Sequence, residues 1–256
     1  MDIVNNKDNY RVAFIIAHKF FRGYPSYLKH YIENILSFYN NPLIIVVDNN
    51  SNYKEDVFST LPTSDNIVLL DNDIDCKFEL GAYQVGIRYV INNNLVGEFD
   101  YYVCSQDNFI IKNKYDFNTL IEGKHTACPI NSWHFDGECR DVYVPVLESL
   151  GLHNNMDKLT FCWCSSFIVS GSKLEQLYGY LQKIVISVRW ESSASERYLA
   201  RILWELNDHK NTDIDGSISD LASRHYDCWN VNLYDPVTSY FVKSVQQKTE
   251  TTTDKW

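Results

Sequence analysis

The stretches Val12-Ala-Phe-Ile-Ile-Ala-His18 and Leu43-Ile-Ile-Val-Val-Asp48 decide the fold of this chain. Both are unbroken hydrophobic runs rich in β-branched residues, and both end on a polar side chain. Two further runs, at residues 67–71 and 101–107, end in the same way. Continuous runs of this kind are typical of strands that are buried on both faces, as in a parallel sheet. The first 112 residues therefore predict four parallel strands.

The ends of these four runs carry polar residues. Each run is followed, directly or within a few residues, by one of the polar residues His18, Asp48, Asp71 and Asp107. In an open parallel sheet, ligands bind outside the carboxyl ends of the strands. We therefore expect one site at this edge, suited to a ligand rich in hydroxyls, imide N–H groups or metal-bridged phosphates.

The segments between the runs predict the remaining architecture. Apolar residues recur at helical spacing in three connecting segments, at residues 24–38, 54–61 and 79–92. This β-α-β-α-β-α-β order predicts an α/β fold with right-handed crossovers. The second half is mixed: we expect strand or loop at 110–117 and 126–129, a helix at 141–150 broken by Pro145, a strand at 160–169, and helices at 173–181 and 192–207.

Composition limits the possible functions. The net charge is −10, and the 23 basic residues do not cluster, which argues against nonspecific nucleic-acid binding. The seven cysteines form no regular framework, so we expect reduced thiols and a cytoplasmic protein. No apolar run approaches the roughly 20 residues that span a bilayer, so we expect no membrane span.

The turn Asp48-Asn-Asn-Ser51 and the segment Gln106-Asp107-Asn108, in this order of elements, give the chain a family resemblance. Over about residues 11–205 it resembles the GT-A fold of nucleotide-sugar-dependent glycosyltransferases, family-2-like members among them. The resemblance implies a Rossmann-like single domain at 1–244 with a mostly parallel central sheet flanked by helices. This domain is expected to consist of a half that binds the nucleotide sugar, at 11–112, and a half that binds the acceptor, at 113–244. We expect a disordered tail at 245–256.

The resemblance also implies which residues meet the donor and the acceptor. Lys77-Phe-Glu-Leu-Gly81 resembles the segment in which a basic residue and a glycine-started helix lie beside the donor. The expected donor site consists of Ala17, His18, Asp48, Asn50, Ser51, Lys77, Gly81 and Gln106. The expected acceptor site consists of Trp133, His134, Asp136 and Trp163. For Asp48, capping of its own turn is the alternative interpretation.

The cation site departs from the family's pattern. The family places two carboxylates, Asp-x-Asp, after the fourth strand, where this chain has only Asp107. The resemblance implies that a Mn²⁺ or Mg²⁺ ion is bound by Asp107, Asn108 and His225. His225 stands in the place of the late histidine that completes the metal site in some family members. Without a cation, Lys77 and Arg88 are the candidates to stabilise the leaving diphosphate.

Glu196 is the expected general base. Its place in the sequence resembles that of the acid on the helix that supplies the base in inverting family members. An acid at a helix N-terminus has a lowered pKa, so it is ionised and ready to accept a proton. Glu191, five residues earlier, is the competing candidate. In a third interpretation, Ser192 or Ser193 caps the helix and both acids only complement its dipole.

The resemblance thus implies an inverting transferase that moves a sugar from a nucleoside-diphosphate donor, preferably a UDP-sugar, to a hydroxyl of a glycan. Two alternatives stay open: a catalytically inactive domain that binds a glycan or a protein, and a sugar nucleotidyltransferase. A dinucleotide oxidoreductase is excluded, because residues 18–23 lack a glycine-rich turn.

Overall fold

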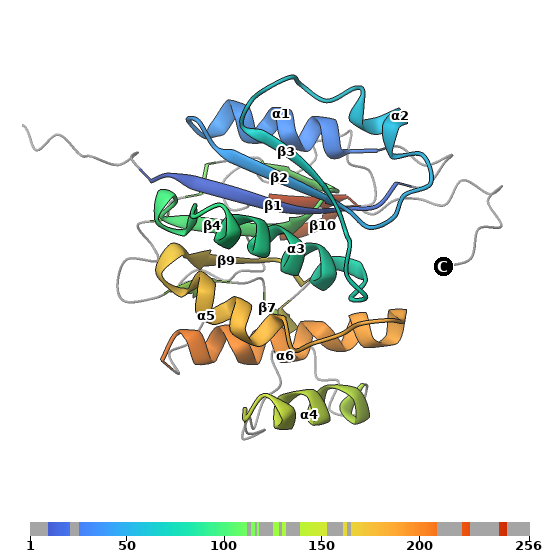
Figure 1. The fold of residues 1–256 in the computed structure, drawn as a ribbon, viewed down its shortest axis with the longest axis vertical. Helices are drawn as coiled ribbons and strands as arrows, with labels where there is room; N and C mark the ends of the chain where they lie inside the picture. The colour runs from blue at the N-terminus through green and yellow to red at the C-terminus, as the bar shows by residue number, and fades with distance from the viewer. Residues whose placement is uncertain are drawn as a thin grey trace, which may run out of the picture.

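A six-stranded sheet runs through the centre of the molecule (Figure 1). The computed structural model describes residues 10–20, 26–111, 114–115, 117, 125–127, 130–131, 139–152, 161–162, 165–208, 222–225 and 241–244. In spatial order, the strands are β3 (Ile67–Asp71), β2 (Leu43–Asp48), β1 (Val12–His18), β4 (Tyr101–Gln106), β9 (Phe167–Ser170) and β6 (Thr126–Ala127). The first four are parallel, whereas β9 is antiparallel to both of its neighbours. The predicted α/β fold with a mostly parallel sheet is confirmed.

Burial explains why the hydrophobic runs form the inner strands. All seven residues of β1 are buried, and so are the last five of β2. In β1, alternate side chains enter two different cores: Ala13 and Ile15 pack on one face of the sheet, and Phe14 and Ile16 on the other. β3 lies at the edge of the sheet and is correspondingly more exposed.

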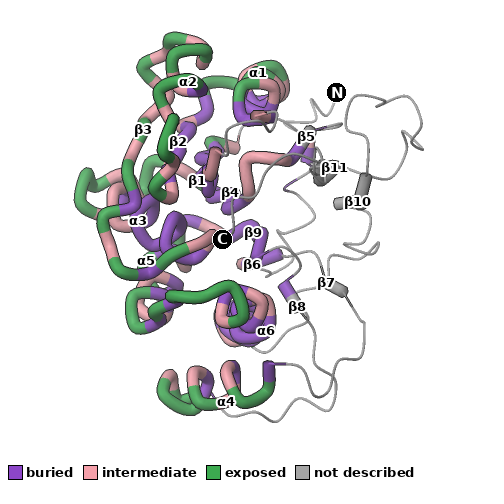
Figure 2. Tube along the Cα trace, turned by 90° about the vertical axis from the view of Figure 1, so that its right-hand side faces the viewer, coloured by how far each residue is buried: buried purple, intermediate pink, exposed green. Residues whose placement is uncertain are grey.

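Helices cover both faces of the sheet (Figures 1 and 2). On one face lies α1 (Leu28–Phe38), and the short α2 (Lys54–Phe58) packs with it. On the other face lie α3 (Phe78–Asn92), α5 (Gly171–Leu181) and α6 (Arg189–Leu206). The helix α4 (Arg140–Ser149) packs against α6, and a 3₁₀ turn, η1 (Val96–Glu98), precedes β4.

Short strands complete the described structure. β5 (Phe109–Ile111) follows β4 directly and pairs antiparallel with β11 (Phe241–Ser244), which in turn pairs with β10 (Ala222–His225). β7 (Ile130–Asn131) pairs with β8 (Phe161–Cys162). In the parts of the chain that the structure describes, no helix is both long and apolar enough to cross a bilayer.

Three expectations for the second half are wrong. Pro145 does not break its helix, because the flanking Tyr143 and Leu147 are buried in the core and hold α4 together despite one lost backbone hydrogen bond. The expected strand at 160–169 is two strands, β8 and β9, separated by Ser165 with a left-handed φ of 49°. The last helix begins at Arg189, three residues before the predicted start.

Several predictions concern parts of the chain that lie outside the described residues. These are the acceptor residues Trp133, His134, Asp136 and Trp163, and the tail at 245–256. For His225, the structure describes the backbone in β10 but not the side chain.

Candidate functional site

The strand order creates a topological switch point between β1 and β4, and we call the region outside the carboxyl ends of these two strands the crevice, after its place in open α/β sheets. From β1 the chain moves to β2 and β3 on one side, and then returns to β4 on the other side of β1. Ligands of open α/β sheets bind at such a switch point, outside the carboxyl ends of the strands. β1 and β2 run toward the right in Figure 1, so this edge lies on the right there and faces the viewer in Figure 2.

His18 and Asp107 meet at the switch point. The Nδ1 atom of His18 lies 2.6 Å from Oδ2 of Asp107, and the backbone N–H of Lys19 donates to the same oxygen at 3.3 Å. Because a carboxylate only accepts, we assign the proton to Nδ1. The side chain of His18 is 1% exposed, and its Nε2 has no hydrogen-bond partner in the described structure. The pair therefore holds an oriented imidazole whose second nitrogen, Nε2, is buried and makes no hydrogen bond within the described structure.

The turn after β2 is closed by its own side chains. The carboxylate of Asp48 accepts hydrogen bonds from the N–H of Ser51 at 2.7 Å and from its hydroxyl at 2.5 Å. Asp48 is 1% exposed, and Asn50 adopts the left-handed φ of 59° that asparagine tolerates. The capping interpretation of Asp48 is thus what the hydrogen bonds support. Asp48 shapes the turn that borders the crevice.

Lys19 ties the loop after β1 to this turn. Its ammonium donates to the backbone carbonyls of Asn49 and Asn50, each at 2.6 Å, and the N–H of Phe20 donates to the hydroxyl of Ser51 at 2.8 Å. Burial lowers the pKa of Lys19, and the nearby Asp48 carboxylate offsets part of this effect. The carboxyl ends of β1 and β2 therefore form one connected rim.

Glu79, which the sequence did not single out, connects the two halves of the chain. Its Oε1 accepts from the amide of Gln106 at 2.7 Å, and its Oε2 accepts from the hydroxyl of Ser192 at 3.1 Å. Gln106 ends β4, Glu79 lies in the first turn of α3, and Ser192 lies in α6. An acid in the first turn of a helix is common, so only the folded contacts identify this one.

Lys77 and Gly81 flank Glu79 in different environments. Lys77 is exposed at the start of α3, and its backbone N–H donates to the carbonyl of Ile186 at 2.7 Å. Gly81 is buried, and a Cβ atom there would lie 1.9 Å from the carbonyl oxygen of Cys76. Lys77 is therefore accessible to a donor, whereas Gly81 allows α3 to pack closely on the preceding loop.

The two candidate bases occupy different places in α6. Glu191 accepts, through Oε2, the backbone N–H groups of Ser187 at 2.6 Å and Val188 at 3.1 Å, which explains why the helix begins at Arg189. Glu196 is the eighth residue of α6, so the expectation that it lies at the helix N-terminus is wrong. It is partly buried and lies one turn beyond Ser192, on the same face of the helix.

The described residues at the expected cation site supply one carboxylate. Asp107 already uses Oδ2 to accept from His18, and Asn108 follows it in the turn before β5. Across the described residues, no group of three or more His, Cys, Asp or Glu could hold a metal ion. Mg²⁺ is often held by one or two carboxylates together with substrate phosphates. This set therefore fits a cation only if a phosphorylated ligand supplies further oxygens.

The backbone of β10 leads toward the same turn. His225 pairs with Ser244, and the neighbouring Lys243 pairs with Phe109, the residue after Asn108. The register therefore brings the His225 backbone to the end of the small sheet that is nearest Asn108.

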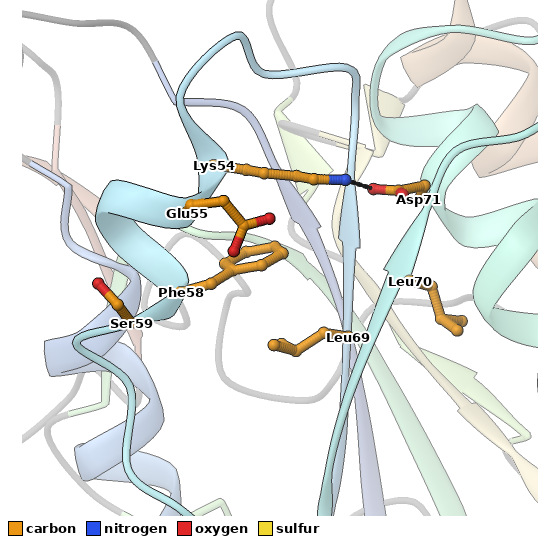
Figure 3. A pocket seen from close by; sticks show the side chains of 7 residues that line it. All are labelled: Lys54, Glu55, Phe58, Ser59, Leu69, Leu70 and Asp71. Atoms are coloured by element: carbon orange, nitrogen blue, oxygen red, sulfur yellow. Dashed lines mark hydrogen bonds and ion pairs between the residues drawn. The ribbon is translucent and has the colours of Figure 1, made fainter.

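A groove of about 420 Å³ flanks the site between α2 and β3 (Figure 3). It is lined by Lys54, Glu55, Phe58, Ser59, Leu69, Leu70 and Asp71. An ion pair between Lys54 and Asp71, 2.5 Å long, spans one end, and Leu69 is 42% exposed. The ring of Phe58 lies 5.7 Å from that of His18, so this residue separates the groove from the crevice.

The structure thus brings together His18, Asp107, Gln106 and Glu79 at the carboxyl edge, and gives Asp48, Ser51 and Asn50 a shaping role beside them. Ala17 is a buried residue of β1 whose carbonyl accepts the N–H of Asp107 at 3.1 Å. Arg88 pairs with Asp73 away from these residues.

Comparisons of the chain with models of known protein families and with curated proteins find no match.

Proposed function

We propose that this protein is a GT-A-type glycosyltransferase that binds a nucleoside-diphosphate sugar in the crevice between β1 and β4. The observation that carries the proposal is the buried contact of His18 with Asp107 at the switch point of the sheet. Polar groups at this point of an α/β sheet are the usual binding place of nucleotides. The antiparallel β9 beside β4 then brings the second half of the chain against the same edge.

The crevice offers separate groups to the parts of such a donor. The rim of Lys19 and the turn at 48–51 faces the nucleoside, and the exposed Lys77 with the first turn of α3 faces the diphosphate. A helix N-terminus presents backbone N–H groups and a partial positive charge to phosphate. Asp107 would hold a Mn²⁺ or Mg²⁺ ion that accompanies the diphosphate, and such an ion would supply positive charge to the leaving group.

The transfer step needs a base for the acceptor hydroxyl. In the proposed inverting reaction, the Glu196 carboxylate takes the proton of a glycan hydroxyl while its oxygen attacks the anomeric carbon. The bond from that carbon to the diphosphate oxygen breaks, and its electron pair leaves with the diphosphate. Glu196 suits this role because it shares a helix face with Ser192, which already contacts Glu79 of the crevice.

Ligand-induced stabilisation tests the binding half of the proposal. Melting temperatures are measured with a panel of nucleoside diphosphates and UDP-sugars, with and without Mn²⁺. A ligand at 100 times its Kd stabilises the folded state by about 2.7 kcal/mol. We expect this stabilisation for nucleotides with one particular nucleobase. The stabilisation should be smaller in the His18→Ala variant and unchanged in Leu69→Ser, a control variant at the groove. If no nucleotide stabilises the protein, the proposal is contradicted. If EDTA does not change the transfer activity, no cation takes part, and Lys77 is the residue that stabilises the leaving diphosphate.

Paired variants test the general base. Glu196→Gln should lower turnover by about 10² to 10⁴ and leave donor binding nearly intact. Glu191→Gln is the matched control, because glutamine also serves in a capping box and should preserve both the helix start and the activity. If Glu191→Gln is the inactive variant, the base is Glu191. A product with the anomeric configuration of the donor refutes inversion.

A non-catalytic binding domain is the second candidate function. The hydrogen bond from His18 to Asp107 favours it, because that bond occupies one oxygen of the only acid that the described residues of the expected cation site supply. Nucleotide binding without any transfer or hydrolysis would identify this second function.

A further inference from the structure

Exposed hydrophobic residues gather in the segment that leads into α6. Among the described residues, five large hydrophobic side chains are strongly exposed, and three of them lie within residues 185–190. We call these three the apolar patch: Val185 is 61% exposed, and Val188 and Trp190 are each 53% exposed. The stretch before α6 is drawn mostly as exposed in Figure 2.

The segment is anchored from beneath, so the exposure is built into the fold. Ile184 and Ile186 are buried, and their carbonyls accept hydrogen bonds from the Gln84 amide at 2.8 Å and from the Lys77 N–H at 2.7 Å. Glu191 fixes the other end by accepting from the backbone of Val188. A fixed surface that presents grouped apolar side chains to water usually marks an interaction site.

Positive charge surrounds the apolar patch. Lys183 is exposed just before it, and Arg189 is exposed between Val188 and Trp190. Lys77 is exposed where its backbone meets Ile186, and Asp75 and Glu79 flank it in the chain. Residues 183–190 contain no acid, although the whole chain carries a net charge of −10. The nearest acid along the chain, Glu191, turns its carboxylate back onto the backbone of Ser187. The segment 183–190 itself is therefore basic and apolar in an acidic protein.

We propose that the apolar patch docks the protein on an anionic lipid surface. Tryptophan is enriched at the interface between membrane and water, and basic residues near the surface are attracted to anionic headgroups. A lipid surface is favoured over a sugar because two of the three residues are valines, which have no flat face for a sugar ring. It is favoured over a second copy of this chain because a two-fold symmetric contact would bring the exposed Lys183 and Arg189 of both copies together, and these like charges repel.

Docking in this way would hold the candidate site close to the lipid surface. The patch leads into α6, whose Ser192 contacts Glu79 at the carboxyl edge of the sheet. In Figure 1, the start of α6 lies on the right, the side toward which β1 and β2 run. The inference goes beyond the proposed function and does not depend on it, because lipid binding requires no nucleotide.

Vesicle co-sedimentation tests the inference on the full chain. Vesicles of phosphatidylcholine alone are compared with vesicles that also contain phosphatidylglycerol. We expect binding to the second kind only, and weakening by about tenfold or more in Val188→Ser/Trp190→Ser. Lys183→Glu/Arg189→Glu should weaken it by more than about tenfold, since each cation near an anionic surface is worth about fivefold. Leu69→Ser, which removes an exposed hydrophobic residue elsewhere, should bind like the wild type.

Three results would overturn the inference. The first is the absence of wild-type binding to anionic vesicles. The second is equal weakening by Leu69→Ser, with all variants melting at the wild-type temperature. The third is a dimer in solution that Val188→Ser/Trp190→Ser abolishes, which would assign the apolar patch to a second copy of the chain. Because the assay contains no nucleotide, a negative result here leaves the proposed function standing, and a failed nucleotide screen leaves this inference standing.

Discussion

The hydrogen bond between His18 and Asp107 joins the last residue of β1 to the turn after β4, 89 residues further along the chain. It changes the role expected for Asp107, because this carboxylate orients an imidazole in addition to the cation-binding role that we propose for it. Sequence alone placed both residues at strand ends, since hydrophobic runs show where strands stop. It could not show that they touch, because strand order is decided by packing across the whole sheet.

Removing the carboxylate should reveal how much this contact stabilises the fold. Asp107→Ala leaves the buried Nδ1 of His18 without its acceptor, which costs about 1–3 kcal/mol of unfolding free energy. Asp73→Ala is the matched control, because Asp73 pairs with Arg88 on the surface, where such pairs contribute about 0–1 kcal/mol. Urea denaturation measures both. Equal losses in the two variants would show that the buried contact has no special weight.

At the scale of elements, the first half of the chain follows its sequence closely because each element carries its own periodic signal. The exceptions in the second half have long-range or capping causes. Tertiary burial carries α4 through Pro145, and Glu191 fixes the start of α6 from within the helix. The apolar patch also escaped sequence reasoning, because Val185 and Ile186 look alike until the fold buries one of them and exposes the other.

Two glycines in helices should respond in opposite ways to alanine. Gly81→Ala places a methyl group against the backbone carbonyl of Cys76, which cannot move aside without distorting α3, and should cost about 1–3 kcal/mol. Gly179→Ala in α5 meets open space, and should stabilise the protein by up to about 1 kcal/mol through helix propensity. Urea midpoints of the two variants measure the contrast. A neutral Gly81→Ala would mean that α3 does not pack this closely on the loop before it.

At the scale of the whole molecule, buried tyrosines set the alkaline limit of stability. Burial raises the pKa of Tyr101 to about 12, and it also raises the pKa values of Tyr31, Tyr83 and Tyr198. These phenols stay neutral in the folded protein while the unfolded chain ionises above about pH 10. Their contribution to stability is therefore complete below about pH 10 and is lost as the pH rises toward the folded pKa values.

The expected loss is about 1.4 kcal/mol per pH unit for each such tyrosine. Urea denaturation at a series of pH values measures it, and Tyr101→Phe should show a shallower decline, because phenylalanine does not ionise. A urea midpoint that stays constant above about pH 10 would contradict buried, neutral phenols in the core.

The sequence could predict the edge of the sheet that carries the site, since all four strand ends are polar. It could not predict the link from Gln106 through Glu79 to Ser192, because three separate elements contribute to it. That link makes the carboxyl edge a surface shared by both halves of the chain.

Hydrogen exchange with and without a nucleoside diphosphate tests the central claim most directly, because it locates the ligand without requiring activity. If the nucleotide binds in the crevice between β1 and β4, backbone amides at 18–20, 48–51 and 105–108 should exchange more slowly in its presence. Amides of the groove at 54–59 and 69–71 should exchange at their original rates. Protection confined to the groove, or no protection at any nucleotide concentration, would contradict the account.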